Sequence, residues 1–258
     1  MNDLFSLKNK IALISDSYSF LGEILVYVLA KSGAVVYAHG DDNYVQNIIN
    51  KYPDFDIRKA EFDLIDKDSV KAFIDNYEFD TLDILVNSSC EDIYDRTKTP
   101  QTSHFIENST SLVTASQTLI ENFLPFLEQS AKNGKYPSVI NIVSISGAII
   151  SEMMIQQDEE NFNMPFHESS RAAIIHWSKY AAAEFGTRGI RFNTISPNTF
   201  INPDQVSKKT FISQLEQKIP MGRIGDLKDI IGPLIFLASE SSKYITGENI
   251  ILDGGMTV

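Results

Sequence analysis

Residues 10–38 decide the fold, and they read KIALISDSYSFLGEILVYVLAKSGAVVYA. The apolar run Lys10–Ser15 has the length and composition of a strand that is buried on both faces. Phe20–Ser32 repeats apolar residues at helical spacing, and Gly33 is the stop signal that follows. Ala34–Ala38 is a second short apolar run. A strand, a helix and a strand in this order predict a parallel β-α-β unit.

The same alternation continues to the end of the chain. We expect further strands at Asp56–Phe62, Leu82–Asn87, Val139–Ser144, Arg191–Ser196 and Asn249–Leu252. We expect further helices at Asn43–Lys51, Asp66–Asn76, Phe105–Gln129, His167–Phe185 and Asp226–Ala238. No internal repeat or linker interrupts this pattern. It predicts a single α/β domain over residues 1–258, built on a doubly wound parallel sheet with seven strands and helices on both faces.

The composition limits the classes of partner. Of 258 residues, 43% are hydrophobic, which is enough for a full core. The 22 basic and 34 acidic residues give a net charge of −12, so neither nucleic acid nor an anionic membrane is expected as a partner. Cys90 is the single cysteine, which excludes an intramolecular disulfide. Because no apolar run approaches ~20 residues and none follows Met1, we expect a cytoplasmic protein without a signal peptide or spanning helix.

A second informative stretch is Phe166–Asn193. Its first part repeats apolar residues at helical spacing, and two glycines then end the helix. His167 and Arg171 stand four residues apart near its start, which places both on one face, one turn apart. Ser144 ends the preceding predicted strand, and sites in such sheets lie beyond the carboxyl ends of the strands. We therefore expect His167 and Arg171 to face Ser144.

The C-terminal third carries the most specific motifs. They are Ile219–Gly225, Asp229-Ile230, Phe236–Ser239, Tyr244–Gly247 and Leu252–Gly255. With the alternation above, they resemble the short-chain dehydrogenase/reductase family over nearly the whole chain. The resemblance implies a Rossmann-like fold whose last helix and strand build a subunit interface. It therefore predicts a homo-oligomer, dimer or tetramer, or a heteromer with an active relative.

Members of this family hold NAD or NADP at a glycine-rich turn after the first strand. The matching residues here are Ser15-Asp16-Ser17-Tyr18-Ser19-Phe20-Leu21-Gly22, of which only the last keeps the family's glycine. The glycines normally allow a tight turn close to the pyrophosphate at a helix N-terminus. Phe20 would fill part of that space, and Asp16 adds a negative charge beside it. The turn therefore predicts weak or absent cofactor binding.

Other matches to the cofactor site are mixed. Asp41, after the second strand, disfavours a 2′-phosphate, which favours NAD over NADP. Asp63 matches an adenine-contacting Asp of the family, although an Asp there also suits a helix cap. Asn87 matches the strand-four motif, in which Cys90 replaces a glycine. The resemblance thus assigns a weak or vestigial cofactor site to Ser15, Gly22, Asp63 and Asn87.

The family's catalytic set is an Asn, a Ser, a Tyr and a Lys, with no metal. Asn108 and Ser144 match the first two, which implies a water relay and a hydrogen bond to the substrate carbonyl. His167 and Arg171 stand where the Tyr and the Lys are expected. Arginine cannot release a proton near neutral pH, whereas histidine acts as an acid or base there. The replacements keep acid–base chemistry and disfavour the family's usual hydride transfer.

Three functions stay open. The preferred one is a non-redox subunit, structural or regulatory, that pairs with an active relative. The second is a cofactor-independent enzyme in which His167 acts as acid or base while Ser144 and Asn108 orient a carbonyl. The third is a divergent oxidoreductase that uses NAD on a carbonyl or alcohol of the acyl-thioester or nucleotide-sugar type.

The stretch Glu152–Pro165 exceeds the family's usual loop length, and we expect it to stand over the site.

Overall fold

The computed structural model describes residues 4–76, 80–88, 102–149, 165–198, 200 and 209–258, with the backbone alone at 102–112, 165–167 and 209–211. Its strands are β1 (Ile11–Ile14), β2 (Val35–His39), β3 (Ile57–Ala60), β4 (Ile84–Asn87), β5 (Ser138–Ile142), β6 (Arg191–Pro197) and β7 (Asn249–Leu252). They form one sheet in the order β3-β2-β1-β4-β5-β6-β7, and each neighbouring pair is parallel. This confirms the expected Rossmann-like, doubly wound sheet.

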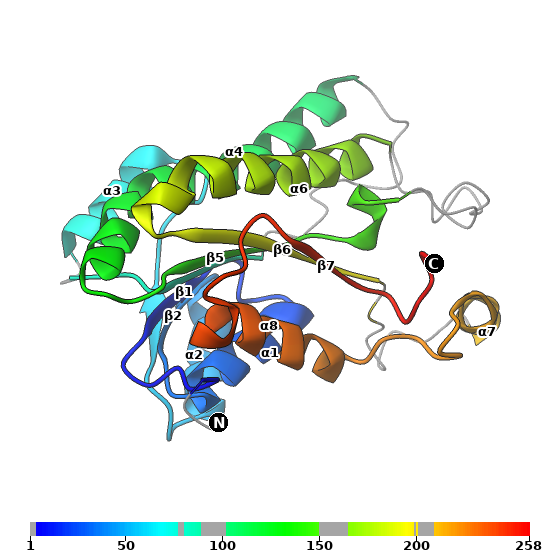
Figure 1. Ribbon diagram of the computed structural model, residues 1–258, viewed down its shortest axis with the longest axis horizontal. Helices are drawn as coiled ribbons and strands as arrows, with labels where there is room; N and C mark the ends of the chain where they lie inside the picture. The colour runs from blue at the N-terminus through cyan, green and yellow to red at the C-terminus, as the bar shows by residue number, and fades with distance from the viewer. Residues whose placement is uncertain (1–3, 77–79, 89–101, 150–164, 199, 201–208) are drawn as a thin grey trace.

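The helices cover both faces of the sheet. They are α1 (Phe20–Lys31), α2 (Asp42–Lys51), α3 (Lys67–Asn76), α4 (Thr102–Lys132), α6 (Pro165–Phe185), α7 (Lys209–Lys218) and α8 (Ile231–Ala238). Short 3-10 turns are η1 (Ile145–Gly147), η3 (Gly186–Arg188), η5 (Leu227–Ile230) and η6 (Glu240–Ser242). Figure 1 shows α1, α2 and α8 on one face and α3, α4 and α6 on the other. The sheet is therefore the middle of three layers.

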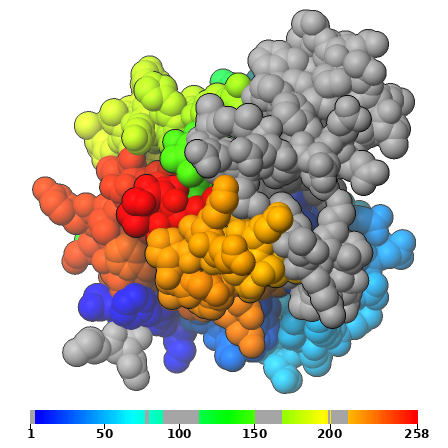
Figure 2. Space-filling model, turned by 90° about the vertical axis from the view of Figure 1, so that its right-hand side faces the viewer, coloured from blue at the N-terminus to red at the C-terminus, as the bar shows by residue number. Residues whose placement is uncertain are grey.

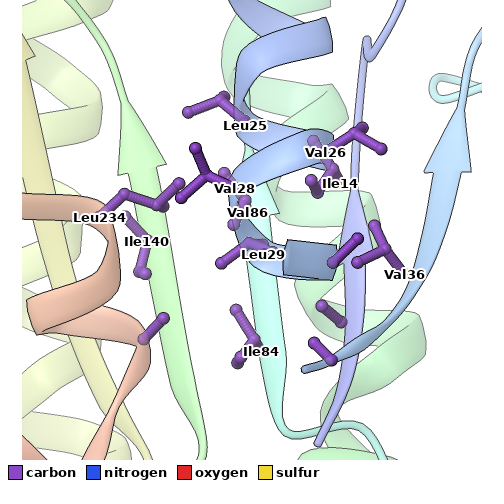
Figure 3. Packing of buried hydrophobic residues seen from close by; sticks show 14 of the residues in the cluster. Ile14, Leu25, Val26, Val28, Leu29, Val36, Ile84, Val86, Ile140 and Leu234 are labelled. Carbon is purple, nitrogen blue, oxygen red and sulfur yellow. The ribbon is translucent and has the colours of Figure 1, made fainter. Parts of the chain in front are cut away.

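Two hydrophobic clusters fill the spaces between these layers. Alternate residues of each strand point to opposite faces, so Ile14 joins the cluster under α1 while Leu13 joins the cluster under α4. On the first face, Val28 of α1 and Leu234 of α8 are buried in the same cluster as Ile140 of β5 (Figure 3). Because both faces are covered, β4, β5 and β6 are buried along their whole length, whereas the edge strand β3 exposes Arg58.

Most expected elements lie where the sequence placed them, and the differences are local. A helix expected over Asp226–Ala238 is in fact η5 followed by α8. Pro233 has no N–H to bond a carbonyl four residues back, so one continuous α-helix through this stretch would lose a hydrogen bond. The helix α7 was not expected. Strand β5 ends at Ile142, two residues before Ser144, which instead caps the 3-10 turn η1.

The carboxyl ends of the strands share one edge of the sheet, and the candidate residues follow those ends. Figure 2 looks onto this end of the molecule and shows α7 in orange beside the C-terminal residues in red. The chain that follows α7 is joined to the C-terminal residues by a hydrogen bond from the Met221 N–H to the Gly254 carbonyl at 3.1 Å. This edge is where ligands bind in open α/β sheets.

Candidate functional site

The turn between β1 and α1 keeps a tight shape although its first glycine position holds Asp16. Asp16 has φ 48°, the left-handed conformation that glycine adopts without strain and that Asp tolerates better than most residues. The turn is fixed to the sheet because the Ser15 N–H donates to the Val86 carbonyl and the Ser15 Oγ accepts from the Ser88 N–H at 2.9 Å. The backbone conformation required at this turn is therefore reached without the glycine.

The N-terminus of α1 packs directly on this turn. Ser19 caps the helix by accepting from the Gly22 N–H at 2.9 Å. A Cβ at Gly22 would lie 2.6 Å from the Asp16 carbonyl oxygen and from the Ser17 Cα, so only glycine fits. Gly22 is thus needed for close packing between helix and turn, which requires no bound nucleotide.

His39, at the end of β2, holds the turn from the other side. Its buried ring accepts a hydrogen bond from the Asp16 N–H at Nδ1, 3.2 Å away, so Nε2 carries the proton and donates to the Phe62 carbonyl at 2.8 Å. The Ser17 N–H and hydroxyl both donate to the His39 carbonyl at 2.7 Å. Burial lowers the pKa of His39 below its ordinary 6.5, a shift that the Phe62 hydrogen bond and the nearby Asp16 and Asp63 charges partly offset. The imidazole is therefore neutral at pH 7.

The residues that follow β2 and β3, among them Asp41 and Asp63, make contacts within the protein. Gly40 lies under Tyr18, since a Cβ there would be 2.9 Å from the Tyr18 ring. Asp41 is exposed and caps α2 by accepting from the Asn43 and Tyr44 N–H groups. Asp63 accepts from the Ile65 N–H at 3.0 Å, which makes it a turn residue.

Asn87 belongs to a buried row of side chains at the ends of β4 and β5. Its Nδ2 donates to the Asn141 Oδ1 at 2.7 Å, and the Asn141 Nδ2 donates to the Ser178 Oγ on α6 at 2.6 Å. The Asn87 Oδ1 is buried and has no hydrogen-bond partner among the described residues. This row links the two strands to α6 directly below the site.

Ser144 and Arg171 are brought together by Ser146, which no motif had singled out. The Arg171 Nη1 donates to the Ser146 Oγ at 3.4 Å, and the Ser146 Oγ is 3.0 Å from the Ser144 Oγ. The Ser146 N–H also donates to the Ser144 Oγ at 3.3 Å. Ser146 is 4% exposed, whereas Ser144 is only partly buried. Arg171 thus lies on the Ser144 side of α6, as the spacing predicts.

Glu168 completes this group, and sequence reasoning missed it. Its Oε1 lies 3.5 Å from the Arg171 Nη1, and both side chains are largely buried, with 17% and 15% exposed. Its Oε2 is buried without a hydrogen-bond partner in the described part of the chain. The i,i+3 spacing of Glu168 and Arg171 on a helix was the available signal.

Gly147 sets the distance between η1 and α6. A Cβ at this position would lie 2.8 Å from the Arg171 carbonyl carbon and Cβ and 2.9 Å from the Ala172 N. These are mostly backbone atoms, so the helix itself would have to move. The glycine therefore allows the backbone of Arg171 to approach the turn that carries Ser144 and Ser146.

The remaining predicted site residues are placed by their backbone alone. Asn108 lies in α4, and His167 lies in the first turn of α6, four residues before Arg171. That His167 faces Ser144 stays a prediction. Cys90 and residues 152–164 of the Glu152–Pro165 stretch lie outside the described residues. In the described part of the chain, no cluster of His, Cys, Asp and Glu could hold a metal ion. None of the helices described there has the length and hydropathy of a membrane span.

The turn between β1 and α1 has features that favour a dinucleotide phosphate and one that disfavours it. α1 has 12 residues and begins at the carboxyl edge of the sheet, where its N-terminal dipole favours an anion. The Asp16 carboxylate, only 10% exposed, adds negative charge beside that N-terminus. The backbone conformation of the turn thus suits a dinucleotide phosphate, whereas the charge of Asp16 opposes one.

A family model described as enoyl-(acyl carrier protein) reductase matches residues 21–257. The chain belongs to the short-chain dehydrogenase/reductase family. The 3-oxoacyl-[acyl-carrier-protein] reductase FabG of Vibrio cholerae serotype O1 is 26% identical over 260 residues, 97% of this chain and 98% of the relative. L-rhamnose-1-dehydrogenase of Scheffersomyces stipitis is 34% identical over 134 residues, 51% of this chain and 48% of the relative. The chain thus spans about half the length of that relative.

Solved structures of this family share the fold over the whole chain. The RhlG/NADP active-site complex of Pseudomonas aeruginosa matches with a TM-score of 0.82 and 26% identity, covering 100% of both chains. A gluconate 5-dehydrogenase from Burkholderia cenocepacia J2315 in complex with NADP and tartrate matches with a TM-score of 0.84 and 22% identity, covering 99% of this chain and 98% of the other.

Proposed function

We propose that the chain is a divergent oxidoreductase of the short-chain dehydrogenase/reductase family, acting on a carbonyl or alcohol compound with a weakly bound nicotinamide dinucleotide. The observation that carries this proposal is that the turn matched to the cofactor and the serine matched to the substrate lie at the same edge of the sheet. The turn at Ser15–Gly22 keeps its tight backbone, and the partly exposed Ser144 follows β5 at the same edge of the sheet. A relative with a reductase name that matches over nearly the whole chain supports it.

The cofactor would be held by the turn, the N-terminus of α1 and the strand ends near Asn87. When bound, the nicotinamide would supply or accept the hydride. Asp41, exposed after β2, disfavours a 2′-phosphate, so we expect NAD to bind better than NADP. The Asp16 carboxylate keeps the affinity low for both.

The proton chemistry would fall to His167, because Arg171 cannot release a proton. Arg171 would keep a fixed positive charge beside the group that holds the substrate oxygen. The acyl-thioester and nucleotide-sugar classes remain the substrate types to examine first. Replacement of His167 by Ala should abolish turnover without changing cofactor binding.

A second function, that of a non-redox subunit, is supported by the hydrogen bonds that the backbone N–H groups of the Ser15–Gly22 turn make within the protein. The Asp16 and Ser17 N–H groups and the Gly22 N–H are all bonded within the protein. A turn that satisfies its own donors does not need a phosphate. In this case the chain would act through contacts with an active relative.

Binding of nicotinamide cofactors distinguishes the two functions. We would follow thermal unfolding in titrations with NAD, NADH, NADP and NADPH, for the native protein and for Asp16→Asn. Asn also tolerates the left-handed conformation, so this substitution removes only the charge. Asp80→Asn is the matched control, because it removes the same charge from an exposed residue that precedes β4.

The redox proposal predicts a small rise in melting temperature with millimolar NAD or NADH. It also predicts an affinity about tenfold higher in Asp16→Asn, as expected for removing one like charge in a partly solvated site. A ligand at 100 times its Kd stabilises by about 2.7 kcal/mol, which such scans detect readily. No rise in either protein with any of the four compounds would reject the redox proposal and favour the subunit.

A further inference from the structure

The imidazole of His39 faces both the backbone and the carboxylate of Asp16. Its Nδ1 accepts from the Asp16 N–H at 3.2 Å and lies 3.9 Å from the Asp16 Oδ1. Its Nε2 donates to the Phe62 carbonyl at 2.8 Å and therefore already carries a hydrogen. A second proton can enter the ring only at Nδ1, the nitrogen that Asp16 contacts. Protonation of His39 thus changes its contacts with Asp16.

Protonation at Nδ1 exchanges one Asp16 contact for the other. An imidazolium only donates, so Nδ1 would no longer accept from the Asp16 N–H. The Asp16 carboxylate, 3.9 Å away, would become its acceptor, and the pair would carry no net charge. The turn would stay attached to β2, because the Ser17 N–H and hydroxyl both donate to the His39 carbonyl at 2.7 Å. The exchange therefore changes the charge of the turn and keeps its attachment to the sheet.

Two charged side chains act on the imidazole in the part of the chain that the structure describes. Asp16 belongs to the turn between β1 and α1, Asp63 follows β3, and both favour the protonated ring. Burial acts in the opposite direction and is the larger effect, so the pKa of His39 lies below its ordinary 6.5. His39 is 7% exposed, and its ring packs against the Phe62 ring at 4.4 Å between centroids. The exchange therefore takes place under acidic conditions.

We propose that protonation of His39 controls how tightly the turn Ser15–Gly22 holds a phosphate-bearing ligand. With neutral His39, the Asp16 carboxylate places one negative charge beside the N-terminus of α1. The imidazolium offsets that charge, and the helix dipole then favours an anion without opposition. By linkage, ligand and proton each raise the affinity for the other by the same factor.

This inference deepens the proposed function by giving the regulation of its cofactor turn, and it rests on that function for the natural ligand, NAD. Between pH 8 and pH 5, the affinity of the turn for an anion should rise about tenfold, as for the removal of one like charge in a partly solvated site. An oxidoreductase with this turn would hold its dinucleotide best under acidic conditions.

Sulfate is the probe, because it stays a dianion across this range and any change in affinity then belongs to the protein. We would titrate the full chain with sulfate at constant ionic strength and follow the Asp16 and Ser17 amides and the His39 ring by NMR. The affinity should rise about tenfold as the His39 ring titrates. His39→Asn, neutral at every pH, should show no such rise. His176→Gln, the matched control, removes an exposed histidine of α6 and should behave as the native protein.

Calorimetry in two buffers of different ionisation enthalpy gives a second measurement, because it counts the protons taken up as sulfate binds. At pH 6, where the acid end of the range is avoided, the native protein should take up a fraction of a proton and His39→Asn none. If His39→Asn does not fold, Asp63→Asn replaces it. That variant loses a charge that favours the imidazolium, so the rise in affinity should move to lower pH.

An affinity that is the same at both ends of the range would overturn the inference, and so would equal proton uptake in the native protein and His39→Asn. Absence of any shift of the Asp16 and Ser17 amides with sulfate would overturn it too. Failure of NAD to bind where sulfate binds in the expected way would reject the proposed function and leave this coupling in place.

Discussion

Replacement of His39 tests the hydrogen bonds that hold the turn at Asp16. In His39→Leu, the Asp16 N–H and the Phe62 carbonyl lose their partners in a buried region. His39→Asn offers an acceptor near the position of Nδ1 and loses the donor to Phe62. The two variants therefore separate the two hydrogen bonds.

The expected loss follows from the groups left without a partner. A buried donor or acceptor without a hydrogen bond costs about 1–3 kcal/mol. His39→Leu should thus lower the free energy of unfolding by roughly 2–5 kcal/mol, and His39→Asn by about half as much. The ring contact with Phe62, at 4.4 Å between centroids, adds to the loss in both variants.

His39 also predicts a pH dependence with a definite sign. Its pKa in the folded protein lies below the ordinary 6.5, because burial disfavours the imidazolium. As the pH falls through 6.5, the unfolded chain therefore binds a proton before the folded one does. The contribution of His39 to stability is complete above that pH and is lost as the pH falls toward the folded pKa, at no more than about 1.4 kcal/mol per unit.

Urea unfolding of the native protein and of both variants, at pH values from 5 to 8, measures the free energy and its slope. The part of the slope below pH 6.5 that belongs to His39 should be absent in both variants. His176→Gln, on the exposed face of α6, is the control and should keep the native slope. A His39→Leu variant within about 0.5 kcal/mol of the native protein would refute the reasoning.

Other substitutions test packing and assembly. Gly147→Ala should cost about 1–3 kcal/mol in urea unfolding, because the new Cβ meets the α6 backbone, whereas Gly232→Ala, with no atom within 4 Å, should cost nothing. Asp83→Asn should cost about 2–3 kcal/mol by the same measurement, because its buried carboxylate accepts from the Ile11 N–H and pairs with Lys135 at 2.8 Å. Light scattering should find a dimer or tetramer, since the edge strand β7 leaves Ile251 39% exposed, and Ile251→Glu should weaken that assembly. A native monomer of 28.9 kDa at micromolar concentration would contradict the expectation.

The layers of the fold could be predicted from sequence because short apolar runs mark β1, β2 and β4, and apolar residues recur at helical spacing in α1 and α6. All seven strands lie within the expected ranges or extend them by one residue, as β2 does at His39, β5 at Ser138 and β6 at Pro197. The break before α8 was missed because the apolar pattern continues across it. The missing N–H of Pro233 and the capping box between Asp226 and Asp229 decide the local geometry instead.

The site was predictable only where spacing carries information. His167 and Arg171 were both expected to face Ser144, and the contact of Arg171 with Ser146 places Arg171 on that side of α6. For His167 this stays a prediction. The bridge through Ser146 could not be read from the sequence, because it depends on η1 turning Ser144 and Ser146 toward each other. No sequence motif singled out His39, at the end of β2. Its two hydrogen bonds join segments 23 residues away in each direction, which no local pattern reveals.

The strand order has a consequence for how the chain folds. The central pair β1 and β4 joins residues far apart, as the bond between Ile11 and Asp83 across 72 positions illustrates. The entropy of closing so long a loop must be overcome before this pairing forms. The β1–β3 half can pair from nearer segments, so we expect it to fold first and to act as a template for β4. Amide hydrogen exchange should then be slowest in β1, β4 and β5 and fastest at the edges β3 and β7.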